Sequence, residues 1–108
     1  MIREIQEIAK EMIVLNALAH GTILSIEDLY VLENAIIAMS QIQKDVNHLL
    51  HSASLTPITN TQESMIILIN FHQLLSQLAI AIDQIYILSI KFVRNYRDEW
   101  DIVQKNMA

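Results

Sequence analysis

The chain of 108 residues contains no cysteine, one glycine and one proline. The absence of cysteine excludes a disulfide framework, a thiolate zinc site and a thiol nucleophile. Tight β-hairpins need Gly, Asn-Gly or Asp-Gly turns, so the scarcity of glycine argues against sheets. Ile, Leu, Ala, Met, Gln and Glu dominate, and all but Ile are strong helix formers. The length suffices for one domain, so the composition predicts a single all-α domain.

Charged residues are scarce as well. They make up 18% of the chain, against 53% hydrophobic residues, whereas ordinary domains carry about 25% charged residues. The net charge is −5, and no cluster of Lys or Arg offers the basic surface that nucleic acids require. A domain of this size buries only about two-thirds of its unfolded surface. We therefore expect a homo-oligomer, a dimer or higher, and no nucleic-acid partner.

Apolar residues recur at helical spacing in three segments. The predicted helices cover about 2–19, 26–51 and 61–105, and the linker covers 52–60. Gly21 follows the first helix and can adopt the left-handed conformation of a C-cap. Ser25 with Asp28 predicts a capping box at the start of the second helix.

The third predicted helix has no stop signal, because neither glycine nor proline occurs after Pro57. About 45 residues of helix would be about 67 Å long, and the first two helices together span nearly the same length. Two arrangements follow. Either the first two helices lie end to end along an unbroken third helix, or the third helix breaks near Asn95 and forms a compact four-helix bundle. The predicted fold is thus a helical hairpin or a small bundle of three or four helices.

The segment from Ser64 to Val93 is apolar around nearly its whole circumference. The first two helices are expected to cover one half of it, which holds Ile67, Leu68, Phe71, Leu74, Leu75, Leu78, Ile82, Ile85, Tyr86, Phe92 and Val93. Apolar residues also lie beside the polar stripe of the other half. Large exposed apolar patches mark interfaces, and Tyr and Trp are frequent in binding hot spots. The predicted interface comprises Ile66, Ile69, Ile80, Ile87, Leu88, Tyr96 and Trp100.

A membrane span is the less favoured interpretation of the same segment. Leu74 to Val93 has the required length of about 20 residues. It contains Asp83 and Lys91, and an Asp at the centre of a spanning helix costs about 2.5–3.5 kcal/mol. Asp83 otherwise predicts either a buried carboxylate or a polar group that sets the register of an interface.

Two histidines on the second helix are the candidates for chemistry. His48 and His51 are three residues apart, with Asp45 one turn before His48, so the three could approach a metal ion. The stretch HLLHSAS, from His48 to Ser54, resembles the phospho-accepting motif of histidine phosphotransfer domains, which are all-α bundles of similar length. That family places Lys-Gly where this chain has His51 and Ser52. The resemblance implies phosphate transfer through His48.

No catalytic triad, phosphate-binding glycine loop or paired-carboxylate cleft occurs in the sequence. We therefore predict a protein that is not an enzyme and that needs no cofactor or metal. Its predicted function is protein–protein interaction, as a small adaptor, chaperone or inhibitor that self-associates through its third helix and contacts a helical partner. A phosphotransfer module using His48 and a membrane-associated accessory subunit are the alternatives. The first segment carries Glu4, Glu7 and Glu11 where a signal peptide is positive, so a cytoplasmic location is expected.

Overall fold

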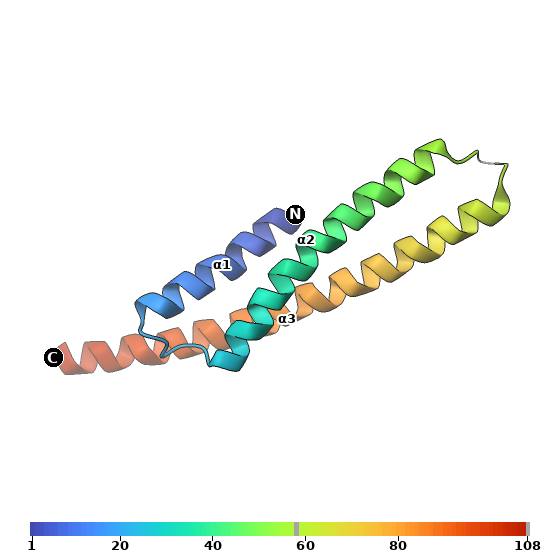
Figure 1. Ribbon diagram of the computed structural model, residues 1–108. Helices are drawn as coiled ribbons and strands as arrows, with labels where there is room; N and C mark the ends of the chain where they lie inside the picture. Colours follow the sequence, from blue (N-terminus) through green and yellow to red (C-terminus); the bar gives the residue numbers. More distant parts are fainter. Residues whose placement is uncertain (58, 108) are drawn as a thin grey trace.

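A computed structural model describes residues 1–57 and 59–107 of the chain. Ile58, which falls in the predicted linker, and Ala108 lie outside the described residues. The described residues form three helices, α1 (Ile2–Leu18), α2 (Ile26–Leu55) and α3 (Thr61–Met107). They make a rod with extents of 73 × 20 × 17 Å (Figure 1). The predicted all-α fold with a long third helix is confirmed.

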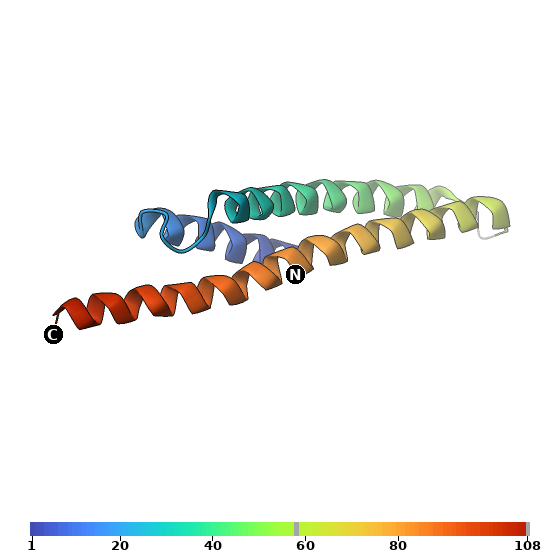
Figure 2. The ribbon, with the colours of Figure 1, turned by 90° about the horizontal axis from the view of Figure 1, so that it is seen from below.

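The helices are not arranged end to end. α2 and α3 form an antiparallel hairpin, and α1 lies beside both of them along the C-terminal half of α3 (Figures 1 and 2). The end-to-end arrangement is therefore wrong. In the observed position α1 places Ala9 and Met12 against both other helices at once, and both side chains are buried. The C-terminal turns of α3 project beyond the loop that joins α1 to α2 (Figure 2).

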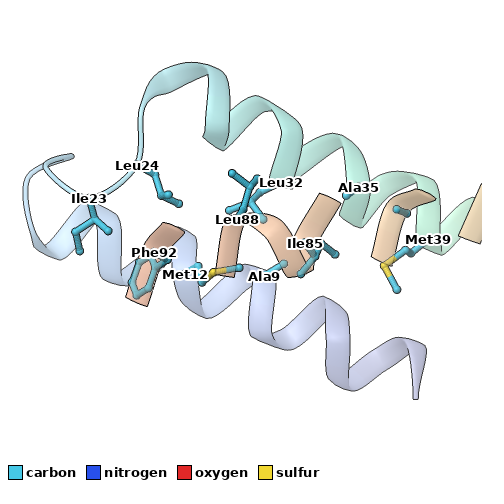
Figure 3. Packing of buried hydrophobic residues seen from close by; sticks show 11 residues of the cluster. Ala9, Met12, Ile23, Leu24, Leu32, Ala35, Met39, Ile85, Leu88 and Phe92 are labelled. Atoms are coloured by element: carbon cyan, nitrogen blue, oxygen red, sulfur yellow. The ribbon is translucent and has the colours of Figure 1, made fainter. Parts of the chain in front are cut away.

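The core lies where the three helices meet (Figure 3). Its buried members are Ala9, Met12, Ile23, Leu24, Leu32, Ala35, Met39, Ala81, Ile85, Leu88 and Phe92. Leu32 and Met39 of α2 are its largest fully buried side chains. Because α1 reaches only part of the rod, this core occupies one half of the molecule, and α2 and α3 continue past it as a two-helix hairpin.

The residues that end each helix explain its length. α1 closes with the amide of His20 donating to the Ala17 carbonyl and that of Gly21 donating to the Asn16 carbonyl. His20 (φ 56°) and Gly21 (φ 73°) are both left-handed, so Gly21 adopts the predicted conformation but shares it with His20. This pattern is a Schellman motif.

α2 runs four residues beyond its predicted end, to Leu55. The Ser54 hydroxyl donates to the His51 carbonyl at 2.6 Å, and the Thr56 hydroxyl donates to the Ser52 carbonyl at 2.9 Å. These bonds let a polar Ser/Thr segment complete the last helical turn. Pro57 then stops the helix, because a residue before proline is disfavoured in the α conformation, and Thr56 is extended.

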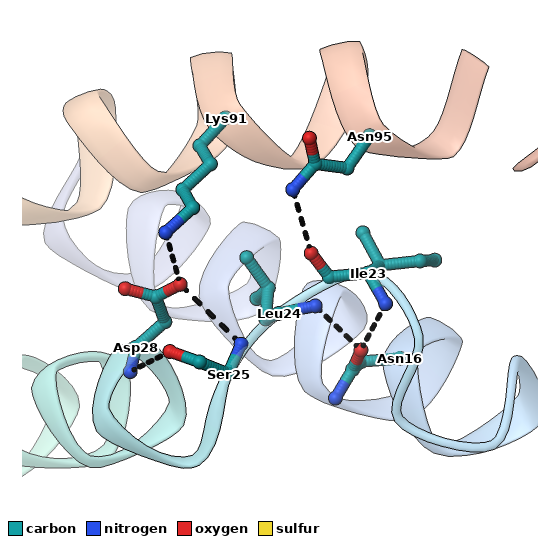
Figure 4. Close-up of polar contacts among 7 residues, drawn as sticks. All are labelled: Asn16, Ile23, Leu24, Ser25, Asp28, Lys91 and Asn95. Atoms are coloured by element: carbon teal, nitrogen blue, oxygen red, sulfur yellow. Dashed lines mark hydrogen bonds and ion pairs between the residues drawn. The ribbon is translucent and has the colours of Figure 1, made fainter. Parts of the chain in front are cut away.

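Asn95 fastens α3 to the loop between α1 and α2 (Figure 4). Its Nδ2 donates to the Ile23 carbonyl at 2.8 Å. Of the two predicted alternatives, the break near Asn95 is wrong and the unbroken third helix is confirmed: α3 continues to Met107, and the asparagine serves as a contact between distant segments. The same loop is held from α1 by the buried Asn16, whose Oδ1 accepts from the amides of Ile23 (3.1 Å) and Leu24 (2.8 Å).

Gln6 is a second buried polar residue. Its Nε2 donates to the Ile36 carbonyl at 2.9 Å and to the Ser40 hydroxyl at 2.8 Å. A buried amide that is paired in this way fixes the lengthwise position of α1 on α2, because a shift of one turn would leave its polar atoms without partners.

The start of α2 is joined to α3 by an ion pair. The predicted capping box of Ser25 and Asp28 is present, and Lys91 Nζ lies 2.7 Å from Asp28 Oδ2 (Figure 4). Partial burial alone raises the pKa of the Asp28 carboxyl. The hydrogen bonds from Lys91 and Ser25, together with the Lys91 charge, more than offset this effect and hold the pKa below its usual value.

We expect Asp28→Asn to remove an acid-dependent part of the stability. A lowered native pKa contributes stability above the unfolded-state pKa of about 3.9, and this stability is lost as pH falls through the native pKa. Half-exposed pairs of this kind contribute about 0.5–1 kcal/mol. Urea unfolding of wild type and Asp28→Asn should differ by that amount at neutral pH and converge as pH falls below the native pKa of Asp28. The exposed Asp101→Asn serves as a control, and a difference that persists unchanged in acid would contradict the assignment.

Candidate interaction surface

α3 contributes only a narrow stripe to the core, formed by Ala81, Ile85, Leu88 and Phe92. Leu88, predicted to lie at the interface, is 7% exposed and packs inside the chain, so that prediction is wrong. The reason is geometric. The contact line of packed helices follows a period nearer 3.5 than 3.6 residues and drifts by about 20° per heptad, which a straight helical projection omits.

The same drift leaves uncovered four residues that α1 and α2 were expected to cover. Leu68, Leu75, Tyr86 and Val93 are each more than half exposed. The helical projection therefore overestimated how much of α3 two short helices can reach. Apolar side chains remain exposed on both sides of the buried stripe.

The first exposed surface is the isoleucine strip, formed by Ile66, Ile69, Ile80 and Ile87. Its members were predicted to be uncovered, and they are 47–61% exposed. Polar residues interrupt the strip, among them Gln73, Ser76 and Asp83. The strip is therefore apolar near its two ends, and polar residues interrupt it between them.

The second exposed surface is longer, and we call it the α3 seam. Its residues alternate in steps of three and four, which is the spacing of a coiled-coil contact line. They are Leu68, His72, Leu75, Ala79, Ile82, Tyr86, Ser89, Val93, Tyr96, Trp100, Val103 and Met107. Most of its large side chains are exposed, whereas Ile82 is partly buried and packs against the core. The exposed fraction is 44–62% for Leu68, Leu75, Tyr86, Val93, Tyr96, Trp100 and Val103, and 82% for Met107. The seam includes Tyr96 and Trp100 of the predicted interface. Its other members were not part of the predicted interface, although the alternating spacing of three and four residues that joins them is present in the sequence.

Three apolar hollows lie along this seam. One of about 340 Å³ includes Ile67, Leu68 and Phe71, beside Ala53 and Thr56 of the α2 end. The next, about 170 Å³, lies between α1 and α3 and includes Ile8, Ile82 and Tyr86. The last, about 140 Å³, is formed by Tyr96, Glu99, Trp100 and Val103.

The α3 residues of these hollows repeat with a period of two heptads. Leu68 is followed by Ile82 and then Tyr96, and Tyr86 is followed by Trp100, each pair fourteen residues apart. Two heptads are four turns of a supercoiled helix. The hollows therefore lie along one side of α3.

The exposed area of the chain is large for its mass. The accessible surface is 7954 Å², whereas a folded monomer of 12.4 kDa typically exposes about 6,100 Å². The excess is about 1,800 Å² per chain, and a stable interface needs about 800 Å² from each partner. The rod therefore exposes more surface than a compact monomer of its mass, and the excess is larger than the area that one partner contributes to a stable interface.

The polar candidates lie elsewhere, at the hairpin end. His48 lines a hollow of about 300 Å³ between α2 and α3, together with Asp45, Ser52, Asn70 and Gln73. His48 and His51 are both exposed. Among the residues that the structure describes, no three His, Asp or Glu side chains gather where they could hold a metal ion. Asp83 is exposed, so the buried-carboxylate interpretation is wrong.

Comparisons with protein-family models, with curated proteins and with solved structures found no match.

Proposed function

We propose that this protein is a protein–protein interaction module, of the adaptor, chaperone or inhibitor kind, that self-associates through α3. One observation carries the proposal: the core uses a single stripe of α3 and leaves apolar side chains exposed on both sides of it. Exposed apolar patches of this extent mark interaction sites in soluble proteins. A second copy of the chain is present in any solution of the protein, so it is always available to cover these exposed surfaces.

The two exposed surfaces of α3, the seam and the isoleucine strip, are suited to two different protein contacts. The α3 seam is continuous and bordered by hollows, whereas the isoleucine strip is shorter and interrupted by polar residues. If one surface joins two copies, the other stays free for a helical partner of a different sequence. Self-association and partner binding on opposite sides of one helix is an arrangement that an adaptor or a small chaperone needs.

The test is the mass of the protein in solution, measured by light scattering coupled to size exclusion. We expect a dimer or a higher assembly for the wild type. Two double variants, Leu75→Glu with Val93→Glu on the seam and Ile80→Glu with Ile87→Glu on the strip, place charge on exposed positions that the core does not use. At least one pair should give a folded chain of monomeric mass. A wild type that is a monodisperse monomer at every concentration would overturn self-association.

A membrane-associated role is the second candidate, because α3 is also long and apolar enough to cross a bilayer. Only 11% of its most apolar window is buried within the chain, so the core does not account for that window. Against this role, Asn70, Gln77 and Asp83 lie exposed along the helix, and each would be costly in hydrocarbon. Flotation of the protein with lipid vesicles in the absence of detergent would favour the membrane role over self-association.

A further inference from the structure

We propose that two copies pair through the α3 seam in antiparallel orientation, about a twofold axis between Tyr86 and Ser89. This inference rests on the proposed self-association and adds its geometry. The seam runs along most of α3, and the exposed area available exceeds what a stable dimer requires. A twofold contact uses the same surface on both copies. In antiparallel orientation the seam must therefore be complementary to its own reversal.

The sizes of the seam residues satisfy that condition. When a second copy is turned end for end so that Ala79 faces Tyr96, the same register places Ser89 opposite Tyr86. The two smallest seam residues then face the two tyrosines. Close-packed interiors alternate large and small side chains across a contact, so that neither voids nor overlaps form.

The remaining positions in this register are apolar on both sides, with one exception. Leu75 faces Trp100, Ile82 faces Val93 and Leu68 faces Met107, whereas His72 faces Val103. The register also uses the whole seam, including the turns of α3 that project beyond the loop between α1 and α2. Each projecting end then lies against the two-helix end of the other copy, where the largest of the three hollows is found.

A parallel pairing in register fits less well. In that pairing each seam residue faces the same residue of the other copy. Tyr86, Tyr96 and Trp100 would each face an identical large side chain, and Ala79 and Ser89 would each face an identical small one. Large residues would meet large ones and small residues small ones, which leaves gaps beside overlaps. The projecting ends of the two copies would also lie against each other.

α1 borders the same contact. Ile8 of α1 lines the central hollow with Tyr86, and its side chain is exposed. Leu15 follows one heptad later on the same side of α1 and is also exposed. A partner helix on the seam therefore covers apolar residues of two helices, not one.

The absence of cysteine makes the register directly measurable. Leu75→Cys and Trp100→Cys are prepared as separate full-length chains, mixed by unfolding and refolding, and treated with a short bismaleimide cross-linker. The two positions are about 37 Å apart along α3, so a parallel pairing in register would keep them beyond the reach of a short cross-linker. We expect a covalent dimer from the mixture and none from either variant alone. The pair Ala79→Cys and Tyr96→Cys repeats the test at a second layer, should Trp100→Cys not fold.

Light scattering on the same samples separates failure of the register from failure of self-association. A covalent dimer from Leu75→Cys alone would show a parallel pairing and overturn the inference. Dimeric mass without cross-links at either layer would also overturn it, because the two copies would then pair in another register or through another surface. Dimeric mass that is lost with Ile80→Glu and Ile87→Glu but kept with Leu75→Glu and Val93→Glu would do the same. A monomeric mass would refute the proposed self-association itself.

Discussion

Replacing Leu32 by alanine should lower the free energy of unfolding by about 2–5 kcal/mol, the range for large-to-small changes at buried sites. Leu32 has no exposed surface, and it lies in the cluster where all three helices contribute side chains. The truncated side chain leaves a cavity that rigid neighbouring helices fill only in part. Urea unfolding followed by circular dichroism measures the loss. It must be done at one protein concentration, because association changes apparent stability.

Leu55→Ala is the matched control for that experiment. Leu55 is the last residue of α2 and is 72% exposed, and exposed substitutions usually change stability by less than about 0.5 kcal/mol. If Leu32→Ala unfolded within 1 kcal/mol of the wild type, on the order of a surface change, the three-helix core would not be the main source of stability.

The second large effect is expected at Asn16. Asn16→Ala removes the oxygen that accepts from the Ile23 and Leu24 amides. Ile23 and Leu24 are buried, and each buried donor left without a partner costs about 1–3 kcal/mol. We expect a loss of about 2–4 kcal/mol in the free energy of unfolding, measured by the same urea titration.

Asn34→Ala, an exposed position on α2, controls for the general effect of the substitution and should be close to neutral. Asn16→Asp keeps an oxygen acceptor and should lose less than Asn16→Ala at acidic pH, where the introduced carboxyl is neutral. Equal stability of Asn16→Ala and Asn34→Ala would mean that the loop amides find other acceptors, and the role assigned to Asn16 would be refuted.

Both predictions concern the loop and core that place α1, and α1 in turn decides which part of α3 stays exposed. α1 borders the central part of the seam and lines its middle hollow. Destabilising the loop at Asn16 should therefore weaken association as well as folding. The seam variants Leu75→Glu and Val93→Glu lie outside the core, so they separate association from the folding of the single chain.

Local sequence determined the helices. Gly21, Ser25 and Pro57 act on their immediate neighbours through backbone conformation and capping, so their effects could be predicted without a fold. The absence of later breakers likewise predicted a long α3. The excess of apolar residues predicted uncovered surface, because a small chain cannot enclose so many.

Only the tertiary structure decided which apolar residues are covered. Leu88 lies in the core while Tyr86 is exposed, although a helical projection predicts the reverse, because the contact line drifts around α3 as the helices wrap. Asn95 is likewise a weak helix former by itself, yet it holds the loop by a bond to Ile23, 72 positions earlier in the chain. The side chains of Asn16 and Gln6 are polar, so a pattern of apolar residues does not predict that they are buried. They are buried because backbone groups elsewhere in the chain form hydrogen bonds with them. The periodicity of a helix indicates which of its residues can be buried, whereas the helices packed against it decide which residues are buried.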